Sequence, residues 1–296
     1  MSVPITPTPL ERSAPLVGLS EAGQLGEGAR RGSPVETLES LTGERSEARD
    51  EIETDRDSFT PATTTAGRRR LIVEAAYSFI DNRRVKETHS FPELILRYGV
   101  TERIELRLGF NAEMGGAGAS VSGASFDEGN ELFGRPGRIE REYAISYGVK
   151  VGVTEQDRWI PRSAFIVQGK TPTGGNATTT PATELVATLV AGWEFQNRWR
   201  FDAAIRYGLA SEEGDRFHQW APSAVLRVPI GERWAAHAEY FGIFTTGKAQ
   251  NATLHFFSPG VHWLATPDLE IGFRLGWGLN DQSARFFVNA GVGLRF

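Results

Sequence analysis

Apolar and polar residues alternate along most of the chain after residue 67. In the segment 103–111, every second residue from Ile104 to Phe110 is apolar, and the residues between them are charged, polar or glycine. The segments 199–209 and 285–296 largely repeat this pattern. Because successive side chains of a strand point to opposite faces, each segment is predicted to be a β-strand with one apolar and one polar face.

Twelve segments of this kind follow one another, each 10 to 13 residues long. A tilted strand of about 10 residues crosses a bilayer, and an even number of antiparallel strands closes an outer-membrane barrel. The pattern therefore predicts an all-β fold, a 12-stranded antiparallel transmembrane barrel over residues 67–296. The predicted strands are 71–80, 91–100, 103–112, 141–153, 160–170, 184–195, 198–209, 218–230, 233–245, 252–264, 269–279 and 284–296.

The predicted connections alternate between tight turns and longer loops. Pairs such as Thr101 and Glu102, or Gly231 and Glu232, suffice after even-numbered strands, whereas residues 113–138 form a long connection rich in glycine and serine. Outer-membrane barrels have short turns on the periplasmic side and long loops outside the cell. We therefore expect both chain ends on the periplasmic side and the 113–138 loop to be an external lid.

The seven tryptophans lie near predicted strand ends. Amphipathic rings prefer the boundary between membrane and water, so they are expected to form two aromatic girdles against lipid and lipopolysaccharide. The alternative is a soluble β-protein with tryptophan in its core, but strand length and turn asymmetry favour the membrane barrel. The girdle residues are Trp159, Trp193, Trp199, Trp220, Trp234, Trp263 and Trp277.

The chain ends on an alternating strand whose last residue is Phe296. This ending resembles the C-terminal signal by which the barrel-assembly machinery recognises outer-membrane proteins. We therefore expect Phe296 to be an assembly signal and that machinery to be a partner.

The first 66 residues differ in composition from the rest of the chain. They contain one aromatic residue, Phe59, and carry 12 acids against 6 bases, whereas residues 67–296 carry 25 acids against 26 bases. So polar a segment buries too little apolar surface to offset its ordering entropy, and we predict that residues 1–66 form a disordered acidic extension. No secretory signal peptide is visible in it. Residues 54–66 directly precede the first strand, and we expect them to enter the periplasmic mouth as a partial plug; the alternative is a flexible tether.

The sequence also resembles a known bacterial family over residues 54–296. The resemblance rests on the stretch TDRDSFT at residues 54–60, the strand around Glu74, the stretch FPELILRYGVTERIELRLG at residues 91–109 and a Pro-Thr-Gly step at residues 172–174. These features are similar to the family labelled "MetA-pathway of phenol degradation", whose members are described as outer-membrane transporters. The resemblance implies a barrel in the outer membrane and a loose connection with aromatic compounds.

If the apolar faces meet lipid, the polar faces line the lumen, and they carry eight acids and eight bases. Unpaired charge in a narrow lumen is costly, so these groups are expected to form ion-pair networks or to contact water. They would line a polar conduit for transport; the alternative is a structural filling that nearly closes the barrel. The predicted lumen residues are Glu74, Glu93, Arg97, Glu105, Arg107, Glu142, Lys150, Arg162, Glu194, Arg200, Asp202, Arg206, Arg227, Glu239, Glu270 and Arg274.

Catalytic and metal-binding motifs are sparse. The chain has no cysteine, which excludes disulfides, thiolate metal sites and a cysteine nucleophile. Its five histidines are scattered without metal-ligand spacing, and we predict no metal and no cofactor. His237 is expected to point inward beside Glu239, whereas Ser258 and His262 share a strand face about 13 Å apart, too far for a proton relay. The acidic balance argues against nucleic acid as a partner.

These features predict an outer-membrane channel without enzymatic activity, in which small solutes diffuse through a charge-lined lumen. Aromatic or hydrophobic compounds are the cargo that the family resemblance implies. The second hypothesis is a non-conducting structural or surface-interaction barrel. The third is an outer-membrane lipid hydrolase, which requires a serine and a histidine within hydrogen-bond distance on the lipid face.

Overall fold

A computed structural model describes residues 50–116, 140–175, 183–212, 215–247 and 251–296. The chain divides into a unit of residues 1–39, which lies outside the described residues, and a unit of residues 40–296, which contains the fold. Most of the predicted external lid, residues 113–138, also lies outside the described residues.

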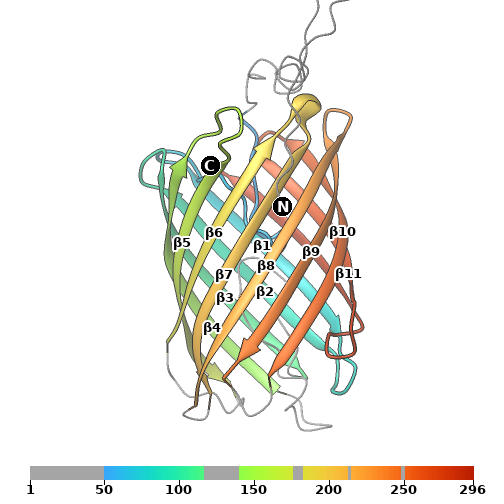
Figure 1. Cartoon of the computed structure of the whole chain (residues 1–296). Coiled ribbons are helices and arrows are strands. Elements are labelled where there is room, and N and C mark those ends of the chain that lie inside the picture. The colour runs from blue at the N-terminus through green and yellow to red at the C-terminus, as the bar shows by residue number, and fades with distance from the viewer. Residues whose placement is uncertain (1–49, 117–139, 176–182, 213–214, 248–250) are drawn as a thin grey trace, which may run out of the picture. The chain divides into compact units, whose positions relative to one another are not determined.

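Twelve antiparallel strands form one closed barrel in which each strand pairs with its neighbours in the sequence and β12 pairs with β1 (Figure 1). One short 3-10 helix, η1 (Gln196–Arg198), lies in the turn after β6. Within the described residues, no helix has the length and hydropathy needed to cross a membrane. The strands are β1 (Leu71–Asp81), β2 (Thr88–Gly99), β3 (Ile104–Gly115), β4 (Glu140–Thr154), β5 (Arg162–Gly175), β6 (Glu184–Glu194), β7 (Arg200–Glu212), β8 (Asp215–Ile230), β9 (Trp234–Thr246), β10 (Ala252–Thr266), β11 (Leu269–Gly278) and β12 (Phe286–Arg295).

The predicted fold class and strand count are confirmed, but several strands extend further on the long-loop side than the alternation indicates. β5 continues to Gly175, and its residue Pro172 still pairs with Ala144 of β4. β8 likewise begins at Asp215, three residues before the predicted start. Backbone pairing continues beyond the apolar belt, where the outward-facing positions are no longer regularly apolar and the alternation is lost.

The barrel has an apolar outside and a polar inside. In β3, Leu106 and Leu108 are 47% and 49% exposed, whereas Glu105 and Arg107, which alternate with them, are buried. A soluble barrel has the opposite arrangement, with apolar residues inside and charge outside. This inversion, together with complete strand closure, makes the fold that of a transmembrane barrel.

The tryptophans lie on the outer surface rather than in a core. Trp159, Trp199, Trp220, Trp234 and Trp277 are each at least 44% exposed. The other two are half-buried by neighbouring rings, since Trp263 stacks on Trp234 and Trp193 stacks on Phe201. Their function as membrane girdles stays a prediction.

The last residue closes the barrel. Phe296 exchanges backbone hydrogen bonds with Leu71, the first residue of β1, and its side chain is 68% exposed. The terminal ring is therefore accessible from outside, and its function as an assembly signal stays a prediction.

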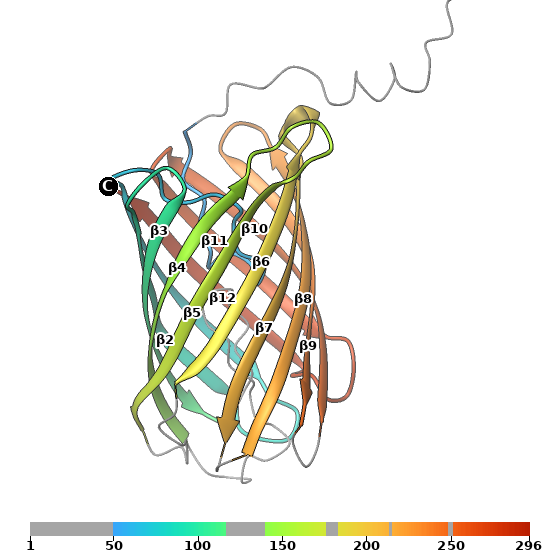
Figure 2. The same cartoon turned by 60° about the vertical axis from the view of Figure 1, so that its left-hand side comes forward.

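Residues 50–66, here called the lumen segment, run inside the barrel near the end where the C-terminus lies (Figures 1 and 2). Residues 54–63 are all buried. The chain leaves the lumen at Gly67, whose φ of 82° suits glycine, and turns into β1. At Gly67 the chain passes so close to Gly99 that a Cβ atom on residue 99 would lie 1.7 Å from the Gly67 carbonyl oxygen. The part of the predicted disordered extension that is described thus lies packed in the barrel; residues 1–49 lie outside the described residues.

Replacing Leu189, in the middle of β6 and 48% exposed, by arginine tests the lipid-facing outer wall. We expect the change to cost about 2–4 kcal/mol in the free energy of unfolding from lipid vesicles, because the charge would lie near the bilayer midplane. The matched change Leu185→Arg, at the end of the same strand, should cost about 0–1 kcal/mol. Urea titration of vesicle-refolded protein measures both, and equal costs would contradict the assignment.

Candidate functional site in the barrel lumen

Arg97 of β2 organises the charged groups of the lumen. Its side chain is fully buried, and its guanidinium makes a two-point contact with the Glu105 carboxylate, with N–O distances of 3.0 and 3.1 Å. The remaining terminal nitrogen donates to Glu74 Oε1 at 2.9 Å and to the Glu53 carbonyl at 2.7 Å. The rigid planar fork of arginine suits such simultaneous contacts, so Arg97 joins the barrel wall to the lumen segment.

Asp55 is the lumen segment's anchor in this network. Its carboxylate lies 2.6 Å from Arg107 Nη1, 3.6 Å from Lys150 Nζ and 3.7 Å from Arg97 Nη1. It also accepts a hydrogen bond from the Ala62 backbone N–H at 2.8 Å. Burial by itself would raise the pKa of Asp55, but these cations and the N–H outweigh it and hold the pKa well below its ordinary value. The group is therefore an anion surrounded by three wall cations.

Carboxylates of the wall bind the backbone of the lumen segment. Glu74 accepts the N–H groups of Asp55 and Arg56 at 2.8 and 3.0 Å. Glu239 of β9 accepts those of Phe59 and Thr60 at 2.9 and 2.7 Å. These bonds satisfy buried N–H groups that have no strand partner, which explains how an irregular segment is stable inside a barrel.

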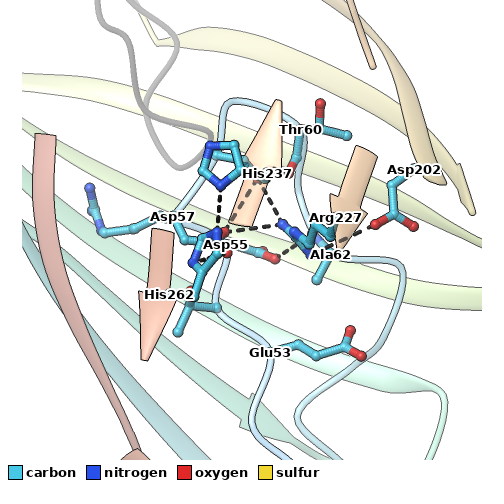
Figure 3. A network of polar contacts seen from close by, with 12 residues as sticks. Glu53, Asp55, Asp57, Thr60, Ala62, Asp202, Arg227, His237 and His262 are labelled. Atoms are coloured by element: carbon cyan, nitrogen blue, oxygen red, sulfur yellow. Dashed lines mark hydrogen bonds and ion pairs between the residues drawn. The ribbon is translucent and has the colours of Figure 1, made fainter. Parts of the chain in front are cut away.

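A second cluster of ion-paired residues lies where the lumen segment nears the short-turn end of the barrel. Arg227 contacts Asp57 at 3.2 Å and Asp202 at 3.7 Å (Figure 3). Glu53 forms an ion pair with Arg200 and accepts a hydrogen bond from Thr64. Burial favours a higher pKa for Glu53, but Arg200 and these hydrogen bonds outweigh it and lower the pKa to about 2.

A cavity of about 580 Å³ opens beside this second cluster of ion-paired residues. It is lined by the lumen segment and by wall residues near the short turns, including Glu53, Asp57, Arg200, Arg227 and Glu270. The lumen is therefore open to small molecules at this mouth and filled by the lumen segment further in.

Most of the predicted lumen charges lie inside the barrel. Glu93 is buried and paired with Arg56 at 3.2 Å, and Arg274 is paired with Glu239 at 3.1 Å. Arg162 and Glu194 are half-buried, and Arg162 contacts Glu155 at 3.3 Å. The Glu142 side chain lies outside what the structure describes. The remaining predicted lumen residues are buried, Arg200 only partly: Glu74, Arg97, Glu105, Arg107, Lys150, Arg200, Asp202, Arg206, Arg227, Glu239 and Glu270.

An aromatic cluster lies inside the lumen, which the alternation of apolar and polar residues does not indicate. Phe59 of the lumen segment stacks on Phe241 of β9, with ring centroids 4.3 Å apart and planes within 8°. Phe241 stacks in turn on Phe256 of β10 at 4.8 Å, and Phe256 contacts Phe287 of β12 at 5.9 Å. The available signal was the adjacent aromatic pairs at 240–241, 256–257 and 286–287, in which one ring of each pair must face inward.

Two arginines cover this aromatic cluster. The Arg206 guanidinium lies 4.5 Å from the centroid of the Phe59 ring, and that of Arg274 lies 5.3 Å from the centroid of Phe287. Cations over ring faces are attracted to the negative face of the ring. The lumen thus combines aromatic surface with positive charge.

Two histidines also meet inside the lumen. His237 of β9 points inward, and its Nδ1 contacts Nε2 of His262 of β10 (Figure 3). The sequence indicated neither this contact nor the proximity of His262 to Asp57, because both depend on the strand register and on the lumen segment.

The geometry does not favour the lipid hydrolase. Ser258 is buried and its hydroxyl donates to the Leu275 carbonyl, while His262 faces the lumen. The three remaining histidines, His89, His218 and His255, each contact a tyrosine hydroxyl through Nδ1. Among the described residues, none of the five imidazole rings therefore has a serine hydroxyl as its hydrogen-bond partner.

Replacing Arg97 by methionine tests whether the buried network holds the structure together. The change leaves the carboxylates of Asp55, Glu74 and Glu105 short of a partner, and we expect it to cost about 3–5 kcal/mol in the free energy of unfolding. The control is Arg285→Met, which removes an exposed ion pair with Asp81 and should cost under about 1 kcal/mol. Urea titration read by heat-modifiable gel mobility measures both, and a similar small effect of the two changes would refute the role of Arg97.

Two solved structures that are similar to this chain are those of outer-membrane proteins. The COG4313 outer membrane channel from Pseudomonas putida F1 is 13% identical with a TM-score of 0.50, and the match covers 86% of this chain and 100% of that chain. The NanC porin is 10% identical with a TM-score of 0.46, covering 76% of this chain and 98% of that chain. At such low identity the likeness to the COG4313 channel shows the fold alone. No curated protein matches the sequence.

A family model matches the sequence over residues 54–296. The match includes most of the lumen segment as well as all twelve strands, and it confirms the resemblance seen at residues 54–60 and 91–109. The chain therefore belongs to the family described as "Putative MetA-pathway of phenol degradation".

Proposed function

We propose that this protein is an outer-membrane channel for small solutes whose conductance is controlled by the lumen segment. The observation that carries the proposal is that the barrel wall is complete without this segment, because β1 pairs directly with β12. The segment fills a lumen that the wall would otherwise leave open. A 12-stranded wall is wider than the side-chain-filled barrels of 8 strands.

The contacts of the lumen segment suit a movable element. Its backbone is held mainly by hydrogen bonds to wall side chains, those of Glu74, Arg97, Glu105 and Glu239. The Ile52 N–H also donates to the Pro267 carbonyl, at the edge of the segment. Strands in a ladder open only with the whole sheet, whereas a segment held by side chains can leave as a local unit. Movement of residues 50–66 would extend the mouth cavity into the lumen.

Aromatic or otherwise hydrophobic compounds are the proposed cargo. The inward rings of Phe241, Phe256 and Phe287 provide an apolar surface in a lumen that is otherwise charged. An aromatic solute can stack on these rings as Phe59 does. The description of the family, which refers to phenol degradation, agrees with this proposal.

The outer membrane is the proposed location, with the short turns and both chain ends on the periplasmic side. The apolar outer face supports contact with lipid, and the exposed tryptophans near the strand ends support girdles at the two interfaces. Lipopolysaccharide and the barrel-assembly machinery are the partners expected for such a protein.

A non-conducting structural barrel is the second candidate, and one observation favours it. Around Arg97 the carboxylates of Asp55, Glu74 and Glu105 all have cationic partners, as expected of a structural filling. The two candidates differ in whether these ion pairs open to form a continuous path.

Single-channel recording with a reversible lock tests the proposed channel. The Thr60 hydroxyl of the lumen segment lies 2.9 Å from the Ser223 hydroxyl of β8, and the chain has no cysteine of its own. We expect the full-length Thr60→Cys, Ser223→Cys double variant to conduct ions in planar bilayers when reduced and to be largely silent when oxidised.

The single cysteine variants should conduct under both conditions. Equal conductance of the locked and unlocked forms would refute control by the lumen segment. Silence of the native protein, and of a variant lacking residues 1–66 that is folded by gel mobility, would instead support the structural barrel.

Acid should loosen the lumen segment through Glu53. Because its pKa in the folded protein is about 2, below the ordinary 4.5, its stabilising contribution is present above pH 4.5 and is lost as the pH falls towards 2. We expect the open probability of the native channel to rise as the pH is lowered from about 5 to about 3. Glu53→Gln should open more readily at neutral pH and respond less to acid, while Glu155→Gln, an exposed control, should behave as native. An acid response that is unchanged in Glu53→Gln would exclude this group as its source.

A further inference from the structure

Three groups that commonly ligate metals converge at one point in the lumen. They are Asp57, His262 and Glu270, each with one ligand atom within 4.8 Å of the others, and all three residues are buried. The Nδ1 atom of His262 lies closest to Oδ2 of Asp57 and Oε1 of Glu270. Asp57 belongs to the lumen segment, His262 to β10 and Glu270 to β11. The point therefore joins the segment to two wall strands.

Among the residues that the structure describes, the His262 Nδ1 atom has no hydrogen-bond partner, although its side chain is almost completely buried. Asp57 Oδ2 lies 3.1 Å away, but off the axis that a hydrogen bond requires. Two atoms that ligate the same metal ion both point their lone pairs at the ion. They therefore do not point at each other, even though they lie close together. The misaligned contact is thus the arrangement expected of two atoms that share an ion.

Each of the three groups is held by a second contact that leaves its ligand atom available. Arg227 binds the other carboxylate oxygen of Asp57 at 3.2 Å. The Thr54 hydroxyl donates to Glu270 Oε1 at 2.6 Å, which leaves the second lone pair of that oxygen, and the whole of Oε2, for an ion. The Nε2 atom of His262 contacts His237 Nδ1. A proton on Nε2, donated to His237, leaves Nδ1 with a free lone pair. Metal-binding histidines usually donate their second N–H in this way.

We propose that Asp57, His262 and Glu270 bind a divalent transition-metal ion such as Zn²⁺. An imidazole with two carboxylates suits Zn²⁺, whereas Ca²⁺ and Mg²⁺ prefer all-oxygen sites. Bonds of about 2.0–2.1 Å in a tetrahedral site place ligand atoms about 3.3 Å apart. The observed separations of 3.1 Å from His262 Nδ1 to Asp57 and 4.0 Å to Glu270 require only a small adjustment.

The ion can reach this site, and it would couple the lumen segment to the wall. Asp57, His262 and Glu270 all line the mouth cavity of about 580 Å³. Because one ligand comes from the segment and two come from the wall, bound metal would resist withdrawal of the segment. The inference goes beyond the proposed channel function, and metal binding can be measured whether or not the barrel conducts.

Calorimetric titration of the full-length, chelator-treated protein with ZnCl₂ in detergent tests the site. We expect one Zn²⁺ per barrel, with the affinity lowered at least tenfold in His262→Gln and in Asp57→Asn. His255→Gln is the matched control, because this outward imidazole is bonded to the Tyr240 hydroxyl and lies against the rings of Tyr240 and Phe244, away from the site, and it should bind as native. Heat-modifiable gel mobility confirms that each variant is folded.

Co²⁺ provides a second readout that does not depend on the size of a heat signal. Its visible absorption in the native barrel should show nitrogen and oxygen ligation, and His262→Gln should lose that spectrum while His255→Gln keeps it. His237→Gln should weaken Zn²⁺ binding about tenfold without abolishing it, as expected of a group that orients a ligand. Absence of stoichiometric binding to the native protein, or equal binding by native protein and folded His262→Gln, would overturn the proposal and leave a plain contact between Asp57 and His262.

Discussion

Burial of charge is the constraint on which the rest of this barrel depends. The outer face is apolar because it meets lipid, so the polar faces of all twelve strands have to be accommodated inside. Arg97 meets this constraint by contacting Glu105, Glu74 and Asp55 while itself fully buried. Without such pairing, each ion would lose several kcal/mol of hydration without compensation.

The lumen segment completes that pairing rather than merely occupying space. Wall cations at Arg107 and Lys150 have Asp55 as a counter-ion, and wall carboxylates at Glu74 and Glu239 receive backbone N–H groups of the segment. The wall and the segment are therefore complementary in charge. If the segment left the lumen, water would enter and hydrate these charged groups. This hydration would reduce the free-energy cost of moving the segment.

The lumen has two chemically distinct regions that meet at the lumen segment. Towards the short turns lie the mouth cavity and the groups Glu53, Arg200 and Asp57. Phe59 joins the opposite, aromatic region by stacking on Phe241. An apolar solute would thus compete with Phe59 for ring surface, whereas a metal ion at Asp57 would act on the same segment a few residues away. The proposed cargo and the proposed ion would have opposing effects on one movable element.

The alternation of side chains was sufficient to predict the twelve strands, their order and the inward charges such as Arg97 and Glu105, because a period of two reports directly which face each residue occupies. It could not predict that Phe59 lies on Phe241 or that His237 meets His262. The position of residues 54–66 directly before the first strand suggested a partial plug, but not which wall groups bind it or that residues 54–63 are all buried. Those contacts depend on the register between neighbouring strands and on which residues a closed wall brings together across its interior. The composition of residues 1–66 predicts disorder, because they can bury little apolar surface. The described part is held instead by polar partners, such as the charge that binds Asp55 and the hydroxyl that binds Thr60, which only the closed barrel supplies. The sequence by itself determined the wall, and the tertiary structure decided what fills it, because filling is set by complementary charge across the lumen and not by the pattern along any one strand.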